Sequence, residues 1–144
     1  MGFVPPGAEW YVAELIEEIR VEGDDRNVVH KNLILIHARS PEAAYARALQ
    51  IGEAGESTYQ NPDGATVKSN FRGLGYLDVI HDGLEDGAEL LYQKKVSVRE
   101  EELAQWVHSK EDLTLFQKPV PRIADPDYSS RDIVDGAKKL IERG

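Results

Sequence analysis

Residues 11–21 read YVAELIEEIRV, and this stretch decides the fold. Every second residue gives the series Tyr, Ala, Leu, Glu, Ile, Val, whereas the positions between them read Val, Glu, Ile, Glu, Arg. Side chains two positions apart lie on the same face of a β-strand, so the pattern predicts a strand with one buried face that only Glu17 interrupts. The polar residues 23–27 predict a turn directly after this strand.

The next residues predict a second strand and a helix. Residues 28–38 are apolar on both faces at residues 33–36, which favours a central place in the sheet. Ser40-Pro41-Glu42 predicts a helix start, because Ser caps free amides, Pro fits the first turn and an acid suits the positive end of the dipole. We expect the helix to end near Gly52. Its inward stripe is expected to be Ala44, Tyr45, Ala48, Leu49 and Ile51.

The rest of residues 9–96 reads as strands joined by turns. Residues 61–64, NPDG, are a strong turn sequence before a strand at residues 66–71. Gly73-Leu74-Gly75 would permit a bend or bulge before strands at residues 76–80 and 89–96. The fold class is therefore α+β, with a mostly antiparallel sheet of four or five strands in the order β-β-α-β-β-β.

The two ends of the chain differ from this domain. Residues 1–8 hold two prolines and two glycines and are expected to form a loose tail, whereas residues 97–144 are helical in character. Ser97 starts a sequence with capping-box spacing, a proline-containing linker covers residues 118–126, and a last helix is expected from Ser129 or Ser130. The apolar residues of this extension are our candidate assembly surface: Leu103, Trp106, Val107, Ile133, Val134, Ala137, Leu140 and Ile141.

The composition narrows the classes of function. The chain has 26 acidic and 17 basic side chains, a net charge of −9, so we expect no nucleic-acid partner, while a basic protein partner is electrostatically plausible. It has no cysteine, which excludes a disulfide framework, a zinc-thiolate site and a cysteine nucleophile. The first residues lack the pattern of a signal peptide and no apolar run is long enough to cross a bilayer, so we expect a cytoplasmic location without membrane contact.

Several short sequences, taken in their order and spacing, resemble those of one family. The succession resembles the bacterial family catalogued as domain of unknown function 4288, over residues 10 to about 92. The resemblance implies a compact α+β domain of bacterial type, and it brings no activity, cofactor or substrate with it. The sequences are Trp10-Tyr11-Val12-Ala13, Ser40-Pro41-Glu42-Ala43-Ala44, Tyr59-Gln60-Asn61-Pro62-Asp63-Gly64, Phe71-Arg72-Gly73-Leu74 and Leu84-Glu85-Asp86-Gly87-Ala88-Glu89-Leu90.

One group of residues carries the best case for an enzyme. Asp78, His81 and Asp82 cluster near a strand end, and Gln93-Lys94-Lys95 follows in the next predicted strand. A carboxylate near an acidic or amide residue and a lysine is the arrangement with which metal-dependent nucleases activate water. The weak ligand Gln and the acidic chain argue for the simpler reading, a solvated edge strand that lysines protect. We expect no bound metal or cofactor.

Three functional hypotheses remain open. The leading one is a non-catalytic protein-binding or homo-oligomeric assembly module, because one sheet face lacks an obvious cover and a homodimer is the commonest way to bury such a surface. The second is a metal-dependent hydrolase or nuclease that uses Asp78, His81, Asp82 and Lys95. The third is an acidic inhibitor or immunity-type protein that masks a basic partner.

Overall fold

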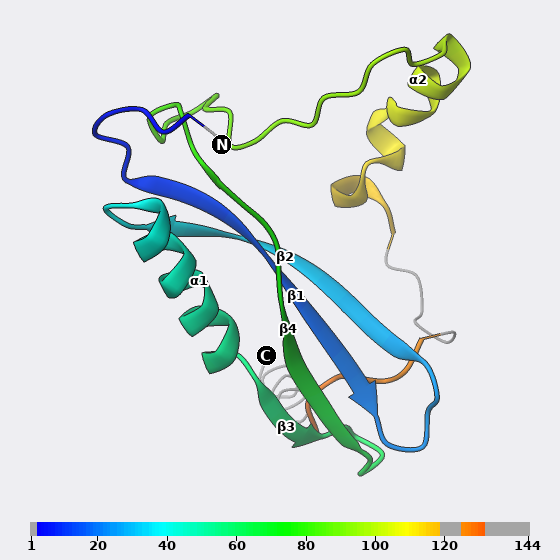
Figure 1. Ribbon diagram of the computed structural model, residues 1–144. Coiled ribbons are helices and arrows are strands. Elements are labelled where there is room, and N and C mark those ends of the chain that lie inside the picture. The colour runs from blue at the N-terminus through cyan, green and yellow to red at the C-terminus, as the bar shows by residue number, and fades with distance from the viewer. Residues whose placement is uncertain (1–2, 119–124, 132–144) are drawn as a thin grey trace, which may run out of the picture. The chain divides into compact units, whose positions relative to one another are not determined.

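Four strands form one antiparallel sheet, and a helix packs on one of its faces (Figure 1). The computed structural model describes residues 3–118 and 125–131. These residues form two compact units, residues 3–91 with 125–131, and residues 92–118. The first unit contains β1 (Trp10–Val21), β2 (Asn27–His37), α1 (Pro41–Ala54), β3 (Ser57–Gln60) and β4 (Thr66–Val79).

The strand order is β2-β1-β4-β3, and every neighbouring pair is antiparallel. This confirms the predicted fold class, and it places β1 and β4 inside the sheet and β2 and β3 at its edges. The predicted central position of the second strand is wrong. Leu33 and Leu35 on one face, with Ile34 and Ile36 on the other, suggested a strand covered on both sides, but Leu33 and Leu35 are about half exposed.

Helix α1 begins where the sequence predicted. The Oγ atom of Ser40 accepts a hydrogen bond from the amide of Ala43 at 3.1 Å, and Pro41 is the first helical residue. The helix does not end at Gly52 but continues to Ala54, and Gly55 caps it. Gly52 has a packing role instead, because a Cβ atom there would come within 2.5 Å of the Phe71 ring.

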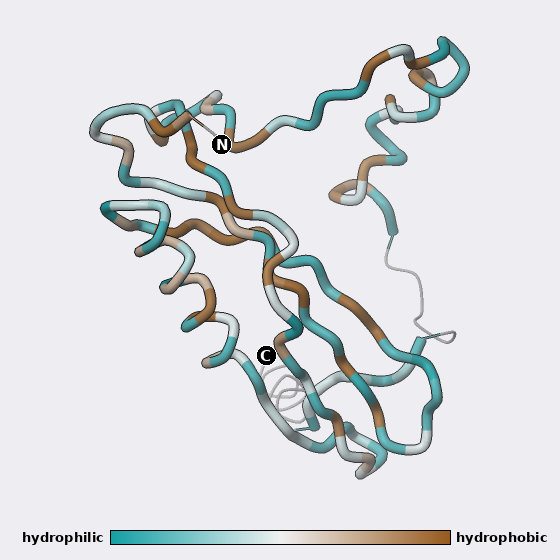
Figure 2. The backbone as a smooth tube through the Cα atoms, viewed as in Figure 1, coloured by the Kyte–Doolittle hydropathy of each residue, from teal (hydrophilic) through white to brown (hydrophobic). Residues whose placement is uncertain are grey.

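Small residues let α1 lie close to the sheet. Its buried residues are Ala44, Ala48 and Gly52, whereas Tyr45, predicted to point inward, is exposed. The alternation of apolar and polar residues along the strands can be followed in Figure 2. The core under the helix consists of Tyr11, Ala13, Leu15, Ile36, Ala44, Ala48 and Val79.

A second core cluster lies on the far part of β1 and is joined by the described residues near the chain end. Ile19, Val21 and Val67 are buried there, with Tyr59 and Tyr128 packed against them. The Tyr59 hydroxyl donates to the carbonyl of Tyr128, and burial raises the pKa of Tyr59. Residues 125–131 therefore pack back onto the domain that begins the chain.

Strand β4 is longer than predicted. It runs without interruption through Gly73-Leu74-Gly75, where the register with β1 shifts twice, so the predicted bulge is confirmed and the predicted break is wrong.

The predicted strand at residues 89–96 is also wrong. The amide of Glu89 donates to Asp82 Oδ2 at 3.0 Å, and this local bond closes a turn in place of a strand pairing.

The second unit contains α2 (Glu100–Trp106) and two short 3-10 helices, η1 (Lys110–Asp112) and η2 (Thr114–Phe116). The predicted Ser97 cap does not form, because α2 begins after Arg99 and has no side-chain cap. Residues 132–144, with the predicted last helix, lie outside the described residues. No helix of the part of the chain that the structure describes is long and apolar enough to cross a membrane.

Candidate functional site

The face of the sheet opposite α1 is our candidate site, and we refer to it as the open face. The odd-numbered residues of β1 point to the helix, so its even-numbered residues and their direct partners on β2 and β4 form the open face. Near the start of β1 these residues are Trp10, Val12, Glu14, Leu33, Leu35, Tyr76 and Asp78, which we name the acidic end. Farther along they include Arg20, Lys31 and Lys68.

Apolar side chains remain exposed on the open face. Leu33 is 58% exposed, Leu35 and Val29 are each 49% exposed, and Tyr76 is 36% exposed. They lie on β2 and β4, on either side of β1. Several exposed apolar side chains on one face of a sheet mark an interaction site more often than a single exposed leucine does.

Glu14 lies in the middle of this apolar surface. It is directly opposite Leu33 on one side and Tyr76 on the other. Its carboxylate lies over the backbone of Gly75, where a Cβ atom would come within 2.3 Å of Glu14 Oε1. Among the described residues, no hydrogen bond or ion pair reaches this carboxylate. A half-buried carboxylate of this kind attracts a cation.

At the far end of the open face, an acid is paired with two arginines. Glu18 accepts hydrogen bonds from Asn27 at 2.6 Å, from Arg20 at 3.3 Å and from Arg72 at 3.3 Å. The bond from Asn27 and the two guanidinium groups lower the pKa of Glu18. The two arginines are thus already paired with an acid, in contrast to Glu14 at the acidic end.

The rim of the acidic end is formed by an aromatic pair and a paired acid. The rings of Trp10 and His37 are 4.7 Å apart, and His37 Nε2 lies 3.0 Å from Glu9 Oε2. On β4, the hydroxyl of Tyr76 donates to Asp78 Oδ2 at 3.1 Å. No lysine or arginine is among the residues of the acidic end, so this surface presents carboxylates together with apolar groups.

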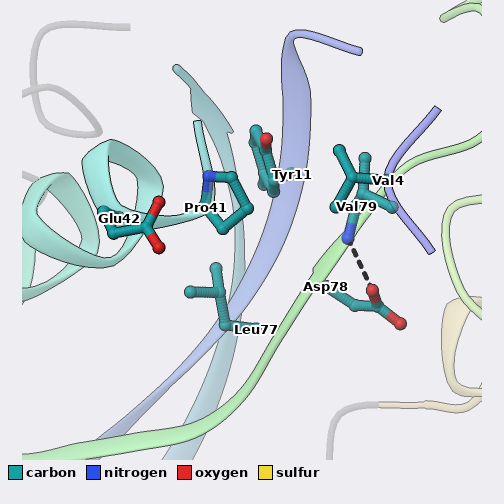
Figure 3. Close-up of a pocket in the computed structure, with 7 residues that line it drawn as sticks. All are labelled: Val4, Tyr11, Pro41, Glu42, Leu77, Asp78 and Val79. Atoms are coloured by element: carbon teal, nitrogen blue, oxygen red, sulfur yellow. Dashed lines mark hydrogen bonds between the residues drawn. The ribbon is translucent and has the colours of Figure 1, made fainter. Parts of the chain in front are cut away.

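Asp78, the first residue of the predicted enzyme site, lines a pocket of about 250 Å³ (Figure 3). The other lining residues are Val4, Tyr11, Pro41, Glu42, Leu77 and Val79. Asp78 Oδ1 accepts the amide of Val79 at 2.8 Å, and Figure 3 shows Glu42 and Asp78 on opposite sides of the pocket. The two carboxylates therefore do not converge on one ligand.

The other predicted site residues lie elsewhere. His81 and Asp82 line a separate pocket of about 220 Å³ next to residues 5–10. Lys95 belongs to the second unit, where its Nζ atom lies 4.9 Å from the centroid of the Trp106 ring. No group of three His, Asp or Glu side chains able to hold a metal ion occurs within residues 3–118 and 125–131. The hydrolase hypothesis therefore stays a prediction, and no such group among the described residues supports it.

The predicted assembly surface is described only in part. Leu103, Trp106 and Val107 are exposed by 44%, 43% and 74%, and α2 has no buried residue. Their partners in that prediction, Ile133, Val134, Ala137, Leu140 and Ile141, lie outside the described residues. The assembly role of this surface stays a prediction.

The sequence did not indicate that the Glu14 carboxylate lies over Gly75. The alternation along residues 11–21 places Glu14 and Glu18 on the face opposite Glu17, and the structure agrees: Glu17 lies on the helix side, with Oε1 4.0 Å from His30 Nδ1. The signal was a glycine pair that predicted a bulge, but only the strand register shows which acid lies over which glycine.

Comparison with known proteins identifies the family of the domain. Residues 10–92, which include β1 to β4 and α1, match the family described as Domain of unknown function (DUF4288). Searches of curated proteins and of solved structures found no match. Because the matched residues make up more than half of the chain, this protein belongs to the Domain of unknown function (DUF4288) family.

Proposed function

We propose that this chain is a non-catalytic protein-binding module, and that the acidic end of the open face holds a basic, apolar segment of a partner protein. The single observation that carries the proposal is Glu14. Its carboxylate has no partner among the described residues, and it lies between the exposed residues Leu33 and Tyr76.

Two features of the surface select a partner of this chemistry. Leu33, Leu35 and Tyr76 supply exposed apolar area, which gains free energy when a partner covers it, at about 25 cal/mol per Å² of apolar surface removed from water. A lysine or arginine of the same segment would then meet Glu14. An uncharged segment would bury this carboxylate without a partner, which is costly. Apolar area therefore favours contact, and Glu14 selects a cation.

The charge of the whole chain acts in the same direction. A net charge of −9 attracts basic partners and accelerates their approach. Lys31, which lies opposite Ile16 on the same face, makes no ion pair with Glu14 among the described contacts. The proposal keeps the bacterial, cytoplasmic setting that the sequence predicts.

A peptide titration tests this proposal. Fluorescence anisotropy of an amphipathic leucine–lysine peptide is measured against a leucine–glutamate peptide of equal length. We expect only the basic peptide to bind, and Glu14→Gln to weaken its binding by roughly tenfold, the equivalent of about 1.4 kcal/mol. Leu33→Asn is expected to weaken binding as well.

Glu53→Gln is the matched control. Glu53 is an exposed acid on α1, away from the open face, and its substitution changes the net charge by the same amount. If Glu14→Gln and Glu53→Gln have equal effects, the attraction is only that of the net charge, and the proposal is wrong. Binding of the acidic peptide with the same affinity would contradict it too.

A further inference from the structure

The edge strand β2 presents a free row of backbone hydrogen-bonding groups. The amide of Ala38 donates to the carbonyl of Glu9 at 3.0 Å, so the even-numbered residues of β2 bond to β1. Neighbouring residues of a strand direct their backbone groups to opposite sides. The amides and carbonyls of Val29, Lys31, Leu33 and Leu35 therefore point away from the sheet, and no bond reaches them from the described residues.

This edge is long and regular. β2 has 11 residues, contains no proline or glycine, and pairs with β1 without a register shift, whereas the other edge strand, β3, has four residues. Natural proteins usually protect such an edge with prolines, bulges or several charges, because unpaired strands join other chains. Here Lys31 is the single lysine or arginine of the strand.

The charge of β2 differs from that of the whole protein. Two copies of a chain with a net charge of −9 repel each other over most of their surfaces. No residue of β2 is an aspartate or a glutamate. β2 is therefore an edge along which two copies meet without placing acid against acid.

We propose that β2 pairs with β2 of a second copy of this chain, antiparallel and about a two-fold axis at Asn32. Asn32 is the middle residue of the strand, so this register pairs the strand along its whole length. It places the outward-directed groups of Val29 and Lys31 opposite those of Leu35 and Leu33 of the second copy. The two four-stranded sheets would then continue into each other, and closed two-fold symmetry leaves no further β2 edge exposed.

The side chains favour this register over its neighbours. On the open face, Val29 lies opposite Leu35 of the second copy, an apolar pair of the kind that stabilises sheets, and Lys31 lies opposite Leu33. A two-fold axis at Lys31 would place the two lysines against each other, which is unfavourable. An axis at Leu33 would leave the first residues of each strand unpaired.

Light scattering of the full chain against concentration is the first test. We expect a mass that rises toward twice that of one chain. Lys31→Pro removes an outward amide without breaking the bonds to β1, so it should return the mass to that of one chain, whereas Lys31→Thr should leave the dimer intact. A single-chain mass for the wild type at every concentration, or a dimer that persists in a folded Lys31→Pro variant, overturns the proposal.

Amide hydrogen exchange of the wild type keeps the test valid if Lys31→Pro does not fold. At high concentration, the amides of Val29, Lys31, Leu33 and Leu35 should exchange at least roughly tenfold more slowly than after dilution, because pairing protects them. A dimer in which these amides exchange at the same rate at both concentrations would use another surface, and that result also overturns the proposal. This proposal rests on the free backbone groups of β2, whereas the partner proposed for the open face is held by side chains, so the light scattering and the peptide titration can fail separately.

Discussion

On the open face, the carboxylate of Glu14 lies over Gly75 and fills the space that a side chain at position 75 would take. A Cβ atom at Gly75 would also come 3.0 Å from Ile16 Cδ1. The bulge in β4 brings this glycine beside β1, between the pairs Glu14–Tyr76 and Leu15–Leu74. The position of the proposed binding carboxylate therefore depends on a residue that has no side chain.

Gly75→Ala should impair binding more than stability. The atom it meets first is the end of a flexible side chain, so Glu14 can move aside, and we expect a loss of at most about 1 kcal/mol in the free energy of unfolding. Displacement of Glu14 should weaken binding of the basic peptide several-fold. Gly55→Ala, where a Cβ atom makes only ordinary contacts at 3.5 Å, is the control and should leave binding unchanged. Equal binding by both variants would contradict this role of Gly75.

Gly52→Ala should destabilise the packing of α1 on the sheet. The added Cβ atom would meet three atoms of the Phe71 ring at 2.5–2.6 Å, and Phe71 packs against the core under the helix. Overpacking of this kind costs about 1–3 kcal/mol, which exceeds the gain of about 1 kcal/mol in helix propensity. Urea unfolding measures the difference. A variant as stable as the wild type would show that Phe71 moves without cost.

Asn61→Ala should destabilise the domain and release residues 125–131. Asn61 is buried, its Oδ1 atom accepts the amides of Asp63 and Ala65, and its Nδ2 atom donates to the carbonyl of Asp127. Losing these bonds should cost about 2–3 kcal/mol in urea unfolding. Gln60→Ala, at the exposed neighbouring position, should change stability by less than about 0.5 kcal/mol. Similar values for both variants would contradict the role of Asn61.

Asp24→Asn should change the acid dependence of stability. Hydrogen bonds from the Arg26 side chain and amide lower the pKa of Asp24 from 3.8 to about 2. A lowered pKa means that the ionised group stabilises the folded state above the unfolded value, and that this contribution disappears as the pH falls through the folded value. The gap between the melting temperatures of wild type and variant should therefore be largest above pH 3.8 and close toward pH 2. A gap that does not change with pH would contradict this assignment.

Local sequence signals predicted the elements of the fold well. The alternation along residues 11–21 predicted β1, and Ser40 with Pro41 predicted the first turn of α1, because strand faces and helix caps depend on residues close in the chain. Gly73 and Gly75 predicted the bulge for the same reason. Such features need no knowledge of distant contacts.

Features that depend on distant contacts were not predictable in this way. Leucines such as Leu33 and Leu35 occur in central strands and, as here, in edge strands, so the sequence pattern placed β2 wrongly. The site around Glu14 required the register between β1 and β4. The chain turns between Asp82 and Glu89, where the amide of Glu89 donates to the Asp82 carboxylate, and the apolar pattern of residues 89–96 gave no sign of this contact.

The most direct measurement of the proposed function is a nuclear magnetic resonance titration of the isotope-labelled full chain with the leucine–lysine peptide. We predict that the shifted backbone signals gather at Glu14, Leu33, Leu35 and Tyr76, and that the signals of α1 stay in place. Glu14→Gln should reduce these shifts, and Glu53→Gln should not. Shifts that gather on α1, or that spread evenly over all acidic residues, would contradict the account.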